Sequence, residues 1–105
     1  FFYLGSGSWK TAQNSFLYSL VNLSGLSPTK MPLKSGREEY AMFYNSGYGP
    51  TYGGGHDLYI CNAPNSNNCS TYLNNTYQCP SGQNNNMVLT GGQYFRVSEM
   101  EVYRL

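Results

Sequence analysis

The sequence predicts a mainly β protein, an antiparallel two-sheet β-sandwich with few or short helices. Short runs of alternating apolar and polar residues are separated by turn-forming Gly, Pro and Asn. No stretch of useful length repeats its apolar residues with the helical period. The 11 tyrosines agree with this fold, because a strand lets a tyrosine bury its ring while the hydroxyl reaches water.

The expected strands follow from this alternation. Residues 14–22 have apolar side chains on both faces of an extended chain, which predicts a strand covered on both sides. Residues 38–44 predict a second buried strand, and residues 57–61 a third that leaves a glycine-rich turn. A further strand is expected within residues 71–78, inside an Asn-rich region that otherwise indicates loops.

The two ends of the chain complete the pattern. Residues 94–105 change parity at Ser98 and Glu99, which predicts two strand segments joined by a bulge or tight bend. The single tryptophan, Trp9, is expected to anchor the core or an edge. We expect residues 1–105 to form one domain, and the start at Phe1 predicts an N-terminally incomplete piece of a larger chain.

Charge and hydropathy exclude several classes of partner. Charged residues make up 10% of the chain and the formal net charge is +1, so no basic stripe is available to neutralise a run of phosphates. Nucleic acid is therefore not an expected partner. No apolar run approaches the roughly 20 residues that cross a bilayer, so no membrane span is expected. The polar surface must come mainly from Asn, Ser, Thr, Tyr and Gly.

A glycine-rich block at residues 49–61 is the most distinctive stretch. It contains Pro50, the glycines 53–55, the only histidine, His56, and the strand that follows. Phosphate-binding loops have the reverse order, because their glycines follow a strand and open a helix. The block therefore indicates a structural turn rather than a nucleotide site.

No catalytic or metal constellation stands out. His56 and Asp57 are the only adjacent histidine and carboxylate, and nothing in the spacing selects a nucleophile to join them. Asp57 with Glu99 or Glu101 could offer oxygen ligands to calcium, but no calcium-loop spacing is present. The sequence therefore predicts a protein that is not an enzyme, with no cofactor. A small hydrolase or metal site around His56 is the weakest alternative.

Three cysteines, Cys61, Cys69 and Cys79, are candidates for a disulfide. With His56 they could form a Cys3His zinc site, but the short Cys pairs typical of such sites are missing. A disulfide is favoured, with Cys61 and Cys69 as the first choice, because this pair would fix the Asn-rich loop to its strand. The sequence leaves the connectivity open, and one thiol must remain free or pair with another chain.

Three N-glycosylation sequons occur, at Asn22, Asn68 and Asn74. The composition alone would produce nearly as many, so their number carries little weight. Two of them lie in the Cys-bearing loop, however, and the surface is polar but uncharged. These features favour an extracellular or lumenal location, with the cytoplasm as the alternative.

Three blocks of the sequence resemble the TLDc domain. They are SFLYSLVN at 15–22, GPTYGGGHDLYI at 49–60 and YFRVSEMEVYRL at 94–105, which occur in the family's order and match the C-terminal two-thirds of its domain. The Asn-rich insert at 62–82 departs from the family's cytoplasmic members. The resemblance implies a β-sandwich with a few short helices and no accepted catalytic site. It also implies fold-defining roles for the matching residues: Gly49, Pro50, Gly54, Gly55, Asp57, Glu101 and Val102.

Two functions remain from this reasoning. The first is a non-enzymatic TLDc-like binding or assembly module, glycosylated and extracellular. If the family's early strands are absent, open sheet edges would allow a protein partner or self-association into a homo-oligomer. The second, which the resemblance implies, is an intracellular regulator of oxidative-stress resistance or of the V-ATPase.

Overall fold

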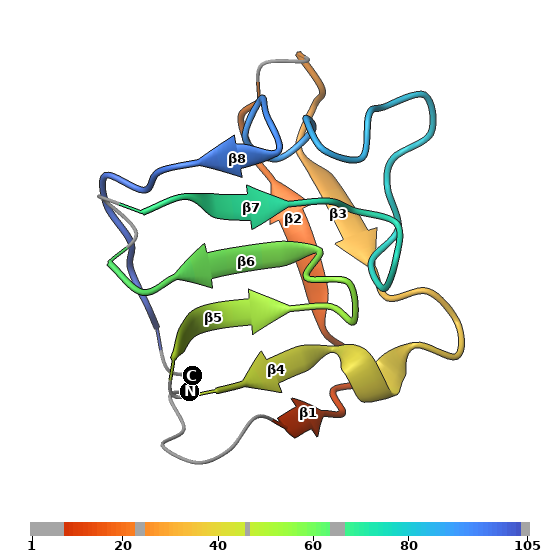
Figure 1. Ribbon diagram of the computed structural model, residues 1–105. Helices are drawn as coiled ribbons and strands as arrows, with labels where there is room; N and C mark the ends of the chain where they lie inside the picture. The colour runs from red at the N-terminus through yellow and green to blue at the C-terminus, as the bar shows by residue number, and fades with distance from the viewer. Residues whose placement is uncertain (1–7, 23–24, 46, 64–66, 104–105) are drawn as a thin grey trace.

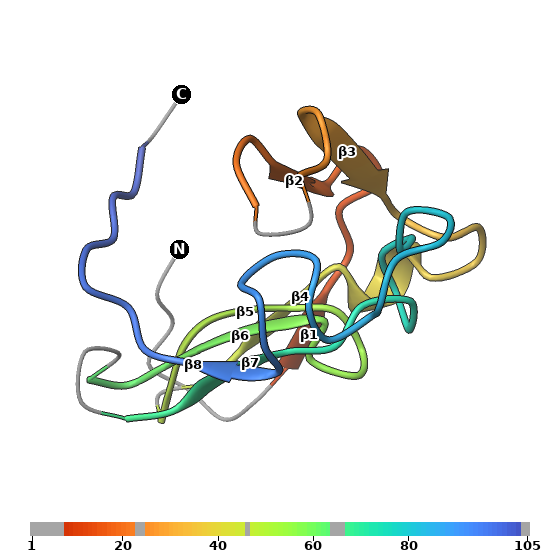
Figure 2. The same cartoon turned by 90° about the horizontal axis from the view of Figure 1, so that it is seen from above.

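Two antiparallel sheets form separate layers in the computed structural model, which describes residues 8–22, 25–45, 47–63 and 67–103 (Figures 1 and 2). The larger sheet has six strands in the order β1-β4-β5-β6-β7-β8, and the smaller sheet pairs β2 with β3. The large-sheet strands are β1 (Ser8–Lys10), β4 (Met42–Tyr44), β5 (Tyr48–Tyr52), β6 (Leu58–Cys61), β7 (Cys69–Thr71) and β8 (Tyr94–Phe95). The small-sheet strands are β2 (Phe16–Ser19) and β3 (Thr29–Pro32).

This arrangement confirms the predicted mainly β, two-sheet antiparallel fold. Within the described residues, the one helix is the short 3-10 turn η1 (Glu38–Tyr40). None of those residues forms a helix that is long and apolar enough to cross a bilayer. Figure 2 shows the two strands of the small sheet lying over one face of the large sheet.

The hydrophobic core lies between the two layers. The small sheet contributes Leu17 and Met31, and the long segment after β7 contributes Leu73, Tyr77 and Val88. The inner face of the large sheet packs against this cluster through Tyr52 and Leu58. Three of the five buried core residues therefore come from a segment without regular strands, so the Asn-rich region is part of the folded core.

The first predicted strand is present but shorter and covered on one side. β2 spans Phe16–Ser19, where Leu17 and Ser19 are buried while Phe16 and Tyr18 are exposed. The expectation of a strand covered on both faces was wrong, because the two-stranded sheet turns only one face toward the core. The outward-facing Phe16 ring instead contacts Lys30, whose ammonium nitrogen lies 4.4 Å from the ring centroid.

The block at residues 49–61 begins differently from the prediction. The block as a whole indicates a turn, but its first two residues, Gly49 and Pro50, lie within β5. Proline is tolerated there because the pairing of β5 with β6 shifts register between Tyr48 and Thr51, which marks a β-bulge. Gly49 is needed at this bulge, since a Cβ atom would lie 2.4 Å from the carbonyl oxygen of Ile60. The strand predicted at 57–61 is confirmed as β6.

Two other expected strands were partly wrong. In residues 38–44 only β4 is extended, because the backbone N–H groups of Arg37 and Tyr40 donate to carbonyls three residues earlier and form a tight turn. The strand expected at 71–78 was wrong beyond Thr71, where β7 already ends. The chain turns there because Asn74 adopts a left-handed conformation, with φ of 81°.

The C-terminal stretch also differs from the prediction. β8 is limited to Tyr94–Phe95, and residues 96–103 form no strand. The expected second strand segment after the parity change was wrong over the described residues, because the chain leaves the sheet after β8 (Figure 2). Residues 104 and 105, the end of the predicted C-terminal strand, lie outside the described residues.

Candidate functional site: the Asp57 lock and the outer aromatic face

The glycine turn between β5 and β6 spans Gly53 to His56. Gly53 has φ of +95°, a conformation that residues with a Cβ rarely adopt. A Cβ atom at this position would also lie 2.2 Å from the Oδ1 atom of Asp57. The turn is closed by the His56 N–H, which donates to the Gly53 carbonyl at 3.0 Å. The predicted structural turn is therefore present.

Asp57 is fully buried behind this turn and holds a distant segment in place. Its Oδ2 atom accepts hydrogen bonds from the backbone N–H of Thr76 at 3.0 Å and of Tyr77 at 2.9 Å. We call this arrangement, with Gly53, the Asp57 lock. Burial raises the pKa of Asp57, whereas the backbone N–H groups act in the opposite direction. Its Oδ1 atom has no hydrogen bond of normal geometry in the described part of the chain.

The remaining motif residues differ in their surroundings. A Cβ on Gly54 would lie 3.3 Å from side-chain atoms of Tyr40, Asn75 and Thr76, and the Gly54 N–H donates to the Thr76 hydroxyl at 2.7 Å. Gly55 is exposed, and the atoms nearest to an added Cβ belong to the Asn75 side chain. Glu101 and Val102 are exposed and lie outside the strands. Their fold-defining role stays a prediction.

The outer face of the large sheet carries a cluster of aromatic rings that sequence reasoning did not identify. Register places Trp9 opposite Phe43, Phe43 opposite Thr51, and Thr51 opposite Tyr59, so these four residues share one face. This face is opposite to the one that carries Tyr52 and Leu58 toward the core. The alternation within each strand indicates which residues share a face of that strand. It does not indicate the register between strands, which brings these rings together.

Within this cluster the rings contact one another. The centroid of Trp9 lies 4.6 Å from that of Phe43, and Tyr48 lies 5.4 Å from Phe43 and 5.1 Å from Tyr59. Tyr48 joins the cluster because the bulge in β5 redirects its side chain. His56 completes the cluster, stacked 5.6 Å from Tyr59. We call the rings of Trp9, Phe43, Tyr48, His56 and Tyr59 the outer aromatic face.

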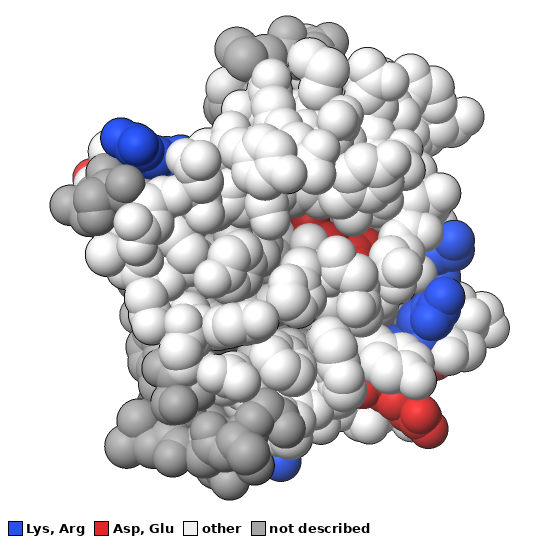
Figure 3. Space-filling view, viewed as in Figure 1, with Lys and Arg blue, Asp and Glu red and all other residues white. Residues whose placement is uncertain are grey.

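The outer aromatic face is only partly buried and weakly charged. Trp9 is 36% exposed, and the other four residues are half-buried. Figure 3 views the molecule with the large sheet in front: Lys and Arg appear near the rim, and most of the surface is neither basic nor acidic. The arrangement thus offers apolar ring surface with the polar edges of tyrosine and histidine.

His56 and Asp57 do not form a catalytic pair in this geometry. The Asp57 carboxylate is directed to the Thr76 and Tyr77 backbone, while the imidazole lies among aromatic rings. Burial lowers the pKa of His56, and the Asp57 charge opposes this only in part. The His56 imidazole is therefore mainly neutral near pH 7. Within the described residues, no hydroxyl group forms a hydrogen bond with it.

The cysteines separate into a pair and a single residue. The Sγ atoms of Cys61 and Cys69 lie 2.9 Å apart and both side chains are buried. Burial, together with the hydrogen bond to Cys69, raises the pKa of Cys61 to about 11. Cys79 is half-buried elsewhere, with its sulfur 3.5 Å from the Gln83 carbonyl. Across the described residues no group of three His, Cys, Asp or Glu side chains is placed to hold a metal, so His56 and the three cysteines are not brought together as a Cys3His set.

The three sequon asparagines also differ. Asn68 and Asn74 are exposed. Asn22 is half-buried, and its amide nitrogen donates to the Ser19 hydroxyl at 3.2 Å and to the Leu26 carbonyl at 3.4 Å. In the folded structure, therefore, Asn68 and Asn74 are accessible at the surface, whereas the Asn22 amide is held by hydrogen bonds.

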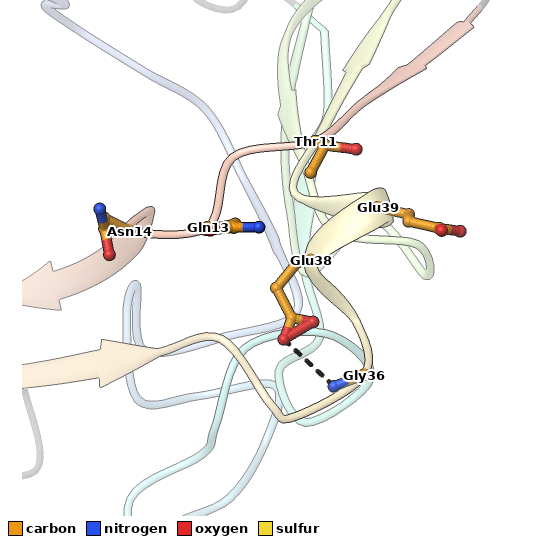
Figure 4. Close-up of a pocket in the computed structure, with 6 residues that line it drawn as sticks. All are labelled: Thr11, Gln13, Asn14, Gly36, Glu38 and Glu39. Atoms are coloured by element: carbon orange, nitrogen blue, oxygen red, sulfur yellow. Dashed lines mark hydrogen bonds between the residues drawn. The ribbon is translucent and has the colours of Figure 1, made fainter.

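A surface hollow of about 700 Å³ is lined by residues outside the outer aromatic face. It is polar, and its lining residues come from the segment after β1 and from the region of η1 (Figure 4). Glu38 accepts a hydrogen bond from the Gly36 N–H at 3.3 Å, while the Glu39 side chain points away from the Glu38 carboxylate (Figure 4). Its two carboxylates do not converge, so the hollow does not form an acid–base or metal site.

The molecule is therefore a mainly β domain of two sheets. Its glycine turn and the buried Asp57 hold the backbone in place. This chain belongs to the TLDc domain family, whose pattern matches residues 4–105. Comparisons with curated proteins and with solved structures found no match.

Proposed function

We propose that this chain is a non-enzymatic TLDc module for binding or assembly that engages a protein partner through the outer aromatic face. The single observation that carries this proposal is a continuous cluster of partly exposed rings on an outward-facing sheet surface. Aromatic residues supply much of the binding energy at protein interfaces. Because these rings already pack against one another, little side-chain freedom is lost on binding.

A second copy of the chain is the partner that we propose first. The outer aromatic face has few charges, so a neutral surface such as its own copy is complementary to it. In the described part of the large sheet, β1 forms one edge and Trp9 lies on that strand. Edge pairing through β1 and stacking through Trp9 could therefore act together.

Self-association can be measured by sedimentation velocity over a range of concentrations. Trp9→Ala is expected to weaken it about tenfold, because a tryptophan at an interface often contributes more than about 1 kcal/mol. Tyr18→Ala is the matched control, since Tyr18 is an exposed ring on the other sheet. A wild-type chain that stays monomeric at all concentrations would rule out a second copy as the partner.

We further propose an extracellular or lumenal location, supported by the Cys61 and Cys69 side chains. Their sulfur atoms, 2.9 Å apart, need little movement to reach a disulfide bond of about 2.05 Å. Oxidation would join the two sulfurs and transfer two electrons and two protons to a disulfide oxidant of that compartment. The exposed sequons at Asn68 and Asn74 agree with the same location.

The disulfide is tested by intact mass before and after reduction, on protein purified with thiols blocked. We expect the mass to increase by two hydrogens on reduction. The melting temperature should also fall, because the disulfide no longer closes the loop between cysteines that lie eight residues apart in the sequence. The expected loss in the free energy of unfolding is about 2 kcal/mol. Cys79→Ser is the control and should leave the mass change intact. Three blocked thiols in the native protein would contradict the pairing.

The alternative is an intracellular TLDc-type regulator of oxidative-stress resistance or of the V-ATPase. One observation favours it: Cys61 and Cys69 can share a hydrogen bond as two buried thiols, and the Cys61 N–H donates to the Cys69 sulfur at 3.3 Å. The pair can therefore remain reduced without an unsatisfied group. The same mass measurement separates the two locations.

A further inference from the structure

We propose that Asn74 is the chain's occupied N-glycosylation site and that its first sugar packs on the ring of Tyr72. This inference rests on the proposed extracellular or lumenal location, where the modification takes place. It goes beyond that proposal because it selects one sequon and assigns the attached sugar a contact on the protein.

Tyr72 and Asn74 both face solvent, with one buried residue between them. Burial alternates along this stretch: Thr71 and Leu73 are buried, whereas Tyr72 is 50% exposed and Asn74 is exposed. The chain has left β7 here and turns at Asn74, where φ is 81°, so the two exposed side chains lie two residues apart at the start of the same turn. A sugar ring attached to the Asn74 amide can therefore lie back over the Tyr72 ring.

The backbone around this pair is held firmly. The Leu73 N–H donates to the Asn85 carbonyl and the Asn74 N–H to the Tyr77 carbonyl, both at 2.9 Å. The Lys34 ammonium donates to the Asn74 carbonyl at 3.0 Å. In the described part of the chain, by contrast, no hydrogen bond engages the Asn74 side chain. The structure thus fixes the attachment point while leaving the amide nitrogen available.

The other two sequons lack this combination. The Asn22 amide nitrogen already donates two hydrogen bonds, and the residue two positions before it is Leu20. Asn68 is exposed, but the residue two positions before it is a serine. Asn74 alone follows an aromatic residue at this spacing. The face of a tyrosine ring carries partial negative charge, which attracts the C–H groups of a sugar.

The attachment itself must precede folding of this loop. The transferred oligosaccharide comes from a lipid-diphosphate donor: the Asn74 amide nitrogen bonds to the anomeric carbon, the bond from that carbon to the diphosphate oxygen breaks, and the nitrogen loses a proton. The sequon hydroxyl of Thr76 is buried in the folded chain, where it accepts the Gly54 N–H at 2.7 Å. A transferase can therefore read Thr76 only before the Asp57 lock closes.

The test uses the 105-residue chain secreted from a eukaryotic host behind a cleavable signal peptide. Peptide mapping is expected to find the glycan on Asn74. Tyr72→Ala is then compared in two backgrounds, the glycosylated chain and Asn74→Gly, which removes the sequon and suits the left-handed backbone. We expect Tyr72→Ala to lower the melting temperature by roughly 4 °C in the glycosylated chain and by less than half as much without the glycan.

Two further arms make the outcome specific. Trimming the glycan to its first N-acetylglucosamine should preserve the effect of Tyr72→Ala, because the contact belongs to the first sugar. Tyr94→Ala, an exposed tyrosine on β8, should have the same effect in both backgrounds. An equal effect of Tyr72→Ala with and without glycan would overturn the packing.

Site mapping separates this inference from the proposed function. A glycan on Asn68 or Asn22 with Asn74 empty would overturn the inference while leaving the extracellular location supported. A secreted chain with all three sequons empty would overturn the inference and remove the glycan support for that location. Neither result bears on the proposed binding through the outer aromatic face, which is tested by measuring self-association.

Discussion

The Asp57 lock and the outer aromatic face lie on neighbouring residues and have opposite physical characters. Asp57 is fully buried and makes directional hydrogen bonds to the backbone 19 and 20 residues away. The next residue back, His56, lies among partly exposed rings whose contacts are not directional. The lock determines the path of the chain. The rings pack against one another and keep a partly exposed surface, to which we propose that a partner binds.

The largest expected effect on folding is at Asp57. Asp57→Ala leaves the buried N–H groups of Thr76 and Tyr77 without an acceptor, at about 2 kcal/mol each. We expect a loss of about 4 kcal/mol in the free energy of unfolding, measured by urea denaturation. Asp57→Asn is the control, because its amide oxygen can accept both bonds. An equal loss in the two variants would show that the lock does not depend on these bonds.

The next largest effect separates two neighbouring glycines. Gly53→Ala forces a Cβ into a left-handed conformation and against Asp57, so we expect a loss of about 3 kcal/mol. Gly55→Ala is the matched variant. The atoms nearest to its added Cβ belong to the exposed Asn75 side chain, which can move, so the variant should cost less than about 1 kcal/mol. Thermal denaturation of both variants measures the difference, and a reversed order would contradict the assigned turn geometry.

A smaller effect is expected at the buried Tyr77 hydroxyl, which connects the core to the sheet. This hydroxyl donates to the Ala41 carbonyl at 2.8 Å and contacts the Ser15 hydroxyl at 2.9 Å. Tyr77→Phe keeps the ring but loses these bonds, so unfolding should become about 1.5 kcal/mol easier. Tyr94→Phe on the exposed β8 is the control and should change stability little.

The smallest effect concerns pH and the outer aromatic face. Burial lowers the pKa of His56, so the unfolded chain binds a proton more readily than the folded chain. Stability from this residue is present near pH 7 and is lost as the pH falls below the unfolded pKa of about 6.5. His56→Asn should therefore weaken the decrease in melting temperature between pH 7 and pH 5. Asp57, whose raised pKa acts in the opposite direction, is unchanged in this comparison.

Sequence reasoning succeeded where local patterns decide the structure. The glycine turn and the strand at 57–61 were predicted, because glycine conformations and alternation are local properties. It failed where a distant contact overrides the local pattern. The stretch after Thr71 alternates like a strand, but Asp57 captures the backbone of Thr76 and Tyr77 and the chain turns.

The candidate sites show the same division. Cys61 and Cys69 were chosen from their position around a loop, and the structure brings their sulfurs together without itself forming a disulfide. The outer aromatic face was not predicted, since its rings come from four strands and a turn, and a shift of one residue in any register would disperse them. The bulge that redirects Tyr48 depends on a pairing that no local pattern reveals.

The sequence by itself determined the mainly β class, the glycine turn, the family and the uncharged composition, because each of these depends on residue type and local spacing. The tertiary structure alone decided which of two adjacent residues, His56 or Asp57, is buried in the lock and which joins the outer aromatic face. The physical reason is that strand register and long-range hydrogen bonds to the backbone set the direction of these side chains.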